Sequence, residues 1–118
     1  MMYYPVLLNV EDRPCLVVGG GGVGERKVKG LLECKARVTV VSPAVTQTLL
    51  RLEEAGRIRI HRRGYETRDL EGMFLVMGAT DNEPLNRRIH SEAEERGLLS
   101  NIADRSEEHT SELQSRQS

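Results

Sequence analysis

The residues best suited to chemistry in this sequence are the glycines that follow its first short apolar run. Gly19, Gly21 and Gly24 fall on the spacing G-x-G-x-x-G, directly after the β-branched residues Val17 and Val18. In a dinucleotide-binding turn, such glycines allow a tight turn, a close approach of the backbone to a pyrophosphate, and close packing of the next helix on the strand. That helix would point its free N–H groups at the phosphates. The pattern predicts a nucleotide-binding turn, and the alternative is a glycine turn with a purely steric role.

The elements that position this turn follow a regular alternation. Short β-rich runs alternate with helical patterns, which is typical of a parallel α/β sheet. We expect strands at 15–18, 37–41, 58–61, 74–77 and 98–102, helices at 23–34, 46–55 and 82–97, and a turn at 63–72. An extended segment, 4–8, leads into the first strand. Right-handed crossovers then give a Rossmann-like, doubly wound sheet with the strand order 3-2-1-4-5.

A ligand of such a sheet binds outside the carboxyl ends of its strands, at the switch point between the first and the fourth strand. The sequence places residues 20–23, 42–44, 78–81 and 101–104 at that edge. Gly78 and Ala79 are small enough for a nucleotide to lie across the strand end. The acidic residue that usually binds the adenosine ribose is missing, because Val41 and Ser42 stand in its place. No arginine for a 2′-phosphate is evident either, so the residues alone leave NAD and NADP open.

Composition excludes several other classes of function. The chain has 17 basic and 18 acidic residues and a formal net charge of −1, which gives no electrostatic case for nucleic acid or for an acidic membrane surface. No apolar run approaches the roughly 20 residues of a membrane helix, and residues 1–10 lack the features of a signal peptide, so we expect a cytoplasmic protein. Cys15 and Cys34 are isolated. They predict no metal site and are interpreted as small buried hydrophobic residues.

Several segments taken together are more specific than the glycine turn. YYPVLLNVEDRPCLVVGGGGVGERKVKGLL, ARVTVVSP, MGATDNEPLNRRI and NIAD occur in this order over residues 3–104. They resemble the N-terminal NAD-binding domain of the siroheme synthase family, which includes precorrin-2 dehydrogenases and sirohydrochlorin ferrochelatases. This resemblance implies oxidation of precorrin-2 to sirohydrochlorin with NAD as the hydride acceptor. It also implies insertion of ferrous iron in several members, and a homodimer for the full-length protein.

The resemblance and the glycine pattern together give a set of candidate site residues. The cofactor-binding candidates are Gly19, Gly21, Gly22, Val23, Gly24, Ser42, Pro43, Ala44, Thr80 and Asp81. Asp81 could orient the ribose or cap the third helix, and both roles stay open. The resemblance places the family's key aspartate at Asp104. Oxidation of the macrocycle releases a proton as well as a hydride, so a carboxylate there could accept that proton. A loop or capping aspartate is the alternative.

The last residues differ in character from the rest. Residues 105–115, RSEEHTSELQS, match the in-frame translation of a common short-read sequencing adapter. We therefore interpret 105–118 as a non-native tail and 1–104 as one NAD-binding Rossmann domain, the N-terminal part of a longer protein. The family continues past Asp104 into a dimerisation segment and a helical module. We accordingly expect the 118-residue chain to bind NAD weakly and not to oxidise precorrin-2.

Another class of protein uses the same fold. A non-catalytic NAD(H)-binding regulatory domain would share the glycine turn, although such domains usually carry the acidic residue after the second strand. A short-chain dehydrogenase would need a Tyr-x-x-x-Lys pair, which this sequence lacks.

At the end of the first helix, Cys34 and Lys35 replace the Ala-Gly that is more usual in the family. We therefore expect a non-glycine residue in the left-handed conformation there.

Overall fold

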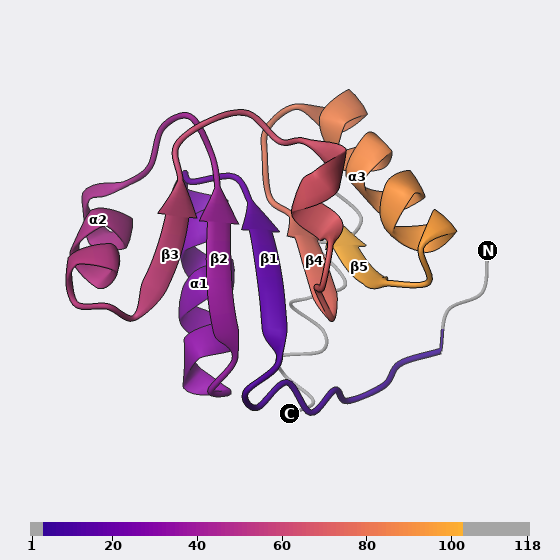
Figure 1. The fold of residues 1–118 in the computed structure, drawn as a ribbon, viewed down its shortest axis with the longest axis horizontal. Coiled ribbons are helices and arrows are strands. Elements are labelled where there is room, and N and C mark those ends of the chain that lie inside the picture. The colour runs from indigo at the N-terminus through magenta and orange to yellow at the C-terminus, as the bar shows by residue number, and fades with distance from the viewer. Residues whose placement is uncertain (1–3, 103–118) are drawn as a thin grey trace.

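The strands of residues 4–102, the part of the chain that the computed structural model describes, form one parallel sheet in the order β3-β2-β1-β4-β5 (Figure 1). The strands are β1 (Pro14–Val18), β2 (Arg37–Val41), β3 (Ile58–His61), β4 (Leu75–Gly78) and β5 (Leu99–Ile102). The helices are α1 (Gly22–Glu33), α2 (Gln47–Glu54) and α3 (Glu83–Glu95), with a 3-10 turn, η1 (Thr67–Leu70), between β3 and β4. The doubly wound sheet and the strand order predicted from the sequence are confirmed.

One face of the sheet packs against α1 and α2. Cys15 and Val17 of β1 lie in the same buried cluster as Val40 of β2, Val28 of α1 and Leu49 of α2. These strand residues alternate with those of the opposite face, as the two-residue period of a strand requires. Each apolar side chain removed from water here contributes about 1.5–3 kcal/mol of transfer free energy.

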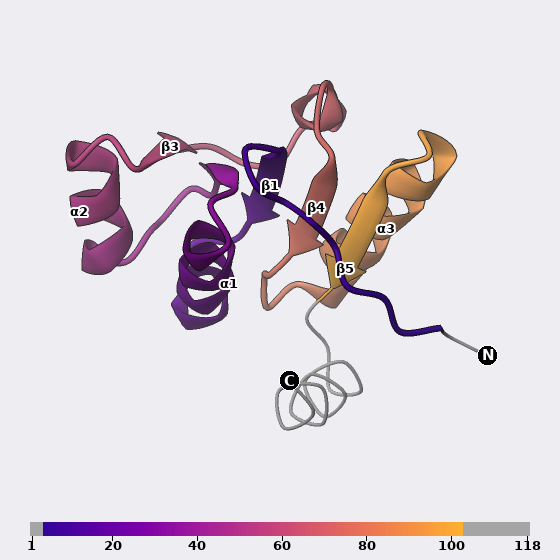
Figure 2. The same ribbon diagram turned by 90° about the horizontal axis from the view of Figure 1, so that it is seen from below.

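The opposite face packs against α3 and η1. Leu16, Val18 and Val76 of the strands form a second buried cluster with Leu70 of η1 and Ile89 of α3. Figure 2 shows α1 and α3 on opposite sides of the twisted sheet. Because β1 is covered on both faces, its sequence is apolar at nearly every position rather than alternating.

Edge strand β3 is covered on one face only. Ile58 and Ile60 are buried, whereas Arg59 and His61 are exposed. The leading segment also differs from the sheet, because Tyr4 and the residues that follow it to Leu8 are exposed and belong to no strand.

The ends of the helices are closed by local contacts. Thr46 and Asn82 cap α2 and α3 by accepting from the backbone N–H of Leu49 at 3.2 Å and of Leu85 at 3.0 Å. Lys35 adopts the left-handed conformation expected after α1, with a φ of 64°. The prediction that Cys34 is buried was wrong. Cys15 is buried, but Cys34 lies beyond the last turn of α1 and is exposed.

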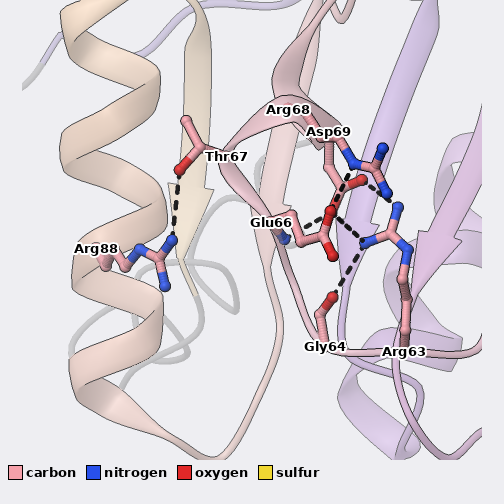
Figure 3. Close-up of polar contacts among 7 residues, drawn as sticks. All are labelled: Arg63, Gly64, Glu66, Thr67, Arg68, Asp69 and Arg88. Atoms are coloured by element: carbon pink, nitrogen blue, oxygen red, sulfur yellow. Dashed lines mark hydrogen bonds and ion pairs between the residues drawn. The ribbon is translucent and has the colours of Figure 1, made fainter.

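The connection between β3 and β4 is held by charged hydrogen bonds (Figure 3). Arg63 donates to both carboxylate oxygens of Asp69, at 3.0 and 2.6 Å. Such a two-point contact fixes the geometry as well as the distance. Figure 3 also shows Arg88 of α3 reaching the hydroxyl of Thr67, at 3.4 Å.

A second set of contacts joins this connection to α3. The hydroxyls of Tyr65 and Thr67 donate to Oε1 of Glu92, at 2.7 and 3.0 Å. The hydrogen bond from Tyr65 lowers the pKa of Glu92. Burial, together with the Glu92 carboxylate, raises the pKa of Tyr65. Glu92 therefore anchors the connection in its ionised form.

We predict that Glu92→Ala lowers the free energy of unfolding by about 1–3 kcal/mol at neutral pH, because the buried Tyr65 hydroxyl loses its acceptor. The pKa of Glu92 is lowered in the folded chain, so its contribution is complete above its ordinary pKa of 4.5 and is lost as pH falls through the lower folded value. Urea denaturation at neutral and at acidic pH measures both effects. Glu95→Ala, at an exposed position of the same helix, is the control. An equal loss in the two variants would contradict the prediction.

Candidate functional site

The first glycine of the turn after β1 is fixed by backbone contacts. Gly19 has a φ of 123°, which side-chain-bearing residues rarely adopt, and its N–H donates to the carbonyl of Val41 at 3.0 Å. A Cβ atom at this position would overlap the carbonyl of Ala79. The turn therefore lies directly against the backbone that follows β4.

The start of α1 is seated on the same turn. A Cβ atom at Gly24 would overlap the carbonyl oxygen of Gly19, so only glycine allows this separation between helix and turn. This is the close packing predicted for Gly24. Gly20 has a comparable role that the sequence did not assign to it. Its Cβ would overlap the carbonyl of Ala44, and its own carbonyl accepts from the N–H of Thr46 at 3.0 Å.

Gly21 and Gly22, unlike the other glycines of the turn, have open space around them. Both are exposed, and a Cβ atom on either would meet nothing within 4 Å. They form the N-terminus of α1, where the first N–H groups have no acceptor inside the helix. Val23 differs from them, because its side chain packs against the core and only its backbone is available at this end. The N-terminus of α1 can therefore accept an anion that comes close to the backbone.

The loop after β2 forms one side of this turn. Ser42 is 8% exposed, and its hydroxyl donates to the carbonyl of Ala44 at 2.7 Å. The Ser42 hydroxyl hydrogen is therefore used within the loop. Pro43 and Ala44 are exposed at the carboxyl end of β2. A ligand at this edge would meet their apolar surface.

The segment after β4 forms the other side. The N–H of Ala79 donates to the carbonyl of Val18 at 2.8 Å, which extends the β1–β4 pairing by one bond. Thr80 follows, half-buried, and Asp81 is exposed. Of the two roles left open for Asp81, capping belongs to Asn82, whose side chain accepts from the N–H of Leu85.

Sequence reasoning missed one polar residue beside this segment. Asn86 is 2% exposed and makes hydrogen bonds to both the backbone and the side chain of Thr80. A signal for it was present, because Asn86 lies on the same helical face as the apolar residues Ile89 and Ala93. A polar residue on such a face needs a buried partner.

The structure thus brings most of the predicted cofactor-binding residues together at the carboxyl edge of β1, β2 and β4. The contact of Gly19 with Ala79 and that of Gly20 with Ala44 join the three segments. Asp104 and the tail 105–118 lie outside the described residues. At the last described strand, the side-chain oxygen Oδ1 of Asn101 is buried and has no hydrogen-bond partner within residues 4–102. A buried acceptor of this kind can be satisfied by a donor that a ligand brings.

Two other structural features are absent from the described residues. Residues 4–102 contain no group of three or more His, Cys, Asp or Glu side chains that could hold a metal ion. Over the same range, no helix has both the length and the apolar character needed to cross a membrane.

A parallel, doubly wound sheet whose first helix begins with open backbone amides beside a glycine turn defines a nucleotide-binding Rossmann domain. The chain belongs to the family described as "Putative NAD(P)-binding", whose model matches residues 6–111. It is 42% identical over 104 residues to a siroheme synthase of Pseudoalteromonas atlantica and 44% identical over 107 residues to one of Thioalkalivibrio sulfidiphilus. These matches cover 88% and 91% of this chain, which spans 22% of each relative.

Solved structures agree with the sequence matches. The structure of SirC, a precorrin-2 dehydrogenase, matches 86% of this chain with a TM-score of 0.75 and 33% identity, and the match covers 49% of SirC. Shikimate dehydrogenase of Aquifex aeolicus matches 80% of this chain and 43% of its own, with a TM-score of 0.55 and 13% identity, which shows the fold alone. The resemblance to the siroheme synthase family inferred from the sequence is confirmed.

We predict that Gly24→Ala lowers the free energy of unfolding by about 1–3 kcal/mol, because the added methyl group forces α1 away from the turn. Gly30→Ala is the matched control, since it lies in the same helix and its Cβ would meet nothing within 4 Å. We expect it to stabilise the chain by up to about 1 kcal/mol through helix propensity. Urea denaturation of both variants tests the prediction. A Gly24→Ala variant as stable as Gly30→Ala would show that the close contact has no energetic consequence.

Proposed function

We propose that this domain binds NAD and takes part in the NAD-dependent oxidation of precorrin-2 to sirohydrochlorin. The observation that carries the proposal is the open N-terminus of α1 at Gly21 and Gly22, next to glycines that admit no side chain. The names of the similar proteins, siroheme synthase and precorrin-2 dehydrogenase, support the choice of reaction.

The described residues fit a dinucleotide at this edge. The backbone N–H groups of Gly21, Gly22 and Val23 would hold the pyrophosphate, as donors at the positive end of a helix. Pro43 and Ala44 would border the adenosine half of the dinucleotide. Thr80 would border the other half, which would lie across the end of β4. When bound, the coenzyme supplies the acceptor for the hydride that leaves the macrocycle. We propose NAD over NADP because NAD is the coenzyme that the siroheme synthase resemblance implies.

We propose Asp104 as the acceptor of the proton that leaves the macrocycle together with the hydride. A carboxylate near the end of β5 would stand at the same edge as the glycine turn. A carboxylate is a suitable group to accept that proton. In a chelatase reaction, the same oxygen atoms would suit ferrous iron as a substrate, since hard oxygen ligands need no Cys or His cluster.

We predict that Gly21→Val weakens NAD binding by tenfold or more, equivalent to about 1.4 kcal/mol. Because Gly21 is the N-cap of α1, where valine is unfavourable, we expect the substitution to lower the free energy of unfolding by no more than about 1 kcal/mol. The branched side chain occupies space that is open in the folded chain but that a pyrophosphate at this helix end would need. Isothermal titration calorimetry with NAD and with NADP measures affinity and coenzyme preference. Gly30→Val, at a distant exposed position of α1, should bind like the unmodified chain. Failure of the unmodified chain to bind either coenzyme would refute the proposed function.

A domain exchange tests the reaction itself. We predict that residues 6–104 of this chain, placed in the Pseudoalteromonas atlantica siroheme synthase in place of the matching segment, support NADH formation from precorrin-2. Asp104→Asn in the exchanged segment should reduce the rate at least a hundredfold, because an amide cannot take up the proton. Its NAD affinity should stay unchanged. An exchanged protein that binds NAD but oxidises no precorrin-2 would instead favour a non-catalytic NAD(H)-binding domain.

A further inference from the structure

A buried asparagine is attached to the segment that closes one side of the proposed coenzyme site. We propose that Asn86 is a positioning residue, which holds Thr80 against the glycine turn and so sets the width of the site between β1 and β4. The inference rests on the proposed function, because it assigns to Asn86 a role in binding the same coenzyme.

The contacts of Asn86 cover both polar groups of the Thr80 backbone. Its Oδ1 accepts from the N–H of Thr80 at 3.3 Å, and its Nδ2 donates to the carbonyl of Thr80 at 2.9 Å. The same Oδ1 accepts from the Thr80 hydroxyl at 2.7 Å. That hydroxyl in turn accepts from the N–H of Asn82 at 3.1 Å. A single side chain therefore fixes Thr80 in position and in orientation.

Thr80 belongs to the segment that lies beside the glycine turn. A Cβ atom on Gly19 would lie 3.1 Å from the N–H nitrogen of Thr80 and would overlap the carbonyl of Ala79. The backbone after β4 therefore approaches the glycine turn as closely as the absence of a side chain allows. A shift of Thr80 would change the separation between the two segments that a dinucleotide must bridge.

The chemistry at this position requires an amide. A leucine of similar size would make neither hydrogen bond, and an aspartate could accept from the N–H but could not donate to the Thr80 carbonyl. The position lies on the inner face of α3, where burial of a polar side chain costs free energy unless it is paired. Packing alone would favour an apolar residue like its neighbour Ile89. The contacts with Thr80 give this buried amide partners for both its oxygen and its nitrogen.

The test compares Asn86→Asp and Asn86→Leu with Asn82→Ala in the 118-residue chain. Asn82→Ala removes the cap of α3 and leaves the contacts between Asn86 and Thr80 in place, so it controls for loss of helix stability. We expect the dissociation constant for NAD to rise tenfold or more in both Asn86 variants and less than threefold in Asn82→Ala. Urea midpoints measured in parallel show whether the three variants lose similar stability.

A second measurement does not depend on the coenzyme. Amide hydrogen exchange at Thr80, followed by NMR, should accelerate at least tenfold in the Asn86 variants relative to Asn82→Ala. Unchanged exchange, or NAD affinity that follows the urea midpoint alike in all three variants, overturns the positioning role. Failure of both Asn86 variants to fold, while Asn82→Ala folds, overturns it too, since Asn86 would then serve the fold itself. If the unmodified chain binds no NAD, the proposed function fails and the inference fails with it.

Discussion

The contact between backbone and backbone at the glycine turn is the constraint on which the rest of the site depends. Gly24 brings α1 against the carbonyl of Gly19, and Gly19 itself lies against the segment after β4. Neither contact leaves room for a methyl group. Because the helix is seated this close to the strand end, its first N–H groups reach the carboxyl edge of the sheet and stay open there. The same closeness makes neighbouring segments part of the site, since any displacement of them is transmitted directly to the turn.

Much of this arrangement could be predicted because it follows from local rules. The β-branched runs at β1 and β2 and the apolar stripes of the helices fixed the alternation of strands and helices, and parallel crossovers then allow few strand orders. The turn was predictable from the spacing of Gly19, Gly21 and Gly24 alone. The left-handed backbone conformation of Lys35 was predictable from helix-end geometry, because the residue that follows a helix often adopts it.

The features that were missed depend on what approaches from elsewhere in the chain. Gly20 appeared to be one more glycine in a run, and its role came only from the loop that reaches Ala44. Asn86 is polar on an apolar face, but its partner became evident only once α3 lay beside β4. Cys34 was misjudged because a residue just past a helix end has no fixed direction in the sequence pattern. The surroundings of these residues are set by segments that are distant in the sequence. The features that were predicted depend on local propensity instead.

The one-sided covering of β3 has a consequence for how the molecule behaves at high concentration. An outermost strand offers unpaired backbone groups to any other polypeptide, which is a common starting point for fibrillar association. In this strand, Ile58 and Ile60 turn toward the interior, and the uncovered surface carries Arg59 and His61. A foreign strand joining here would have to place its own side chains next to the guanidinium of Arg59. The positive charge of Arg59 thus disfavours pairing of another chain along the open edge of β3.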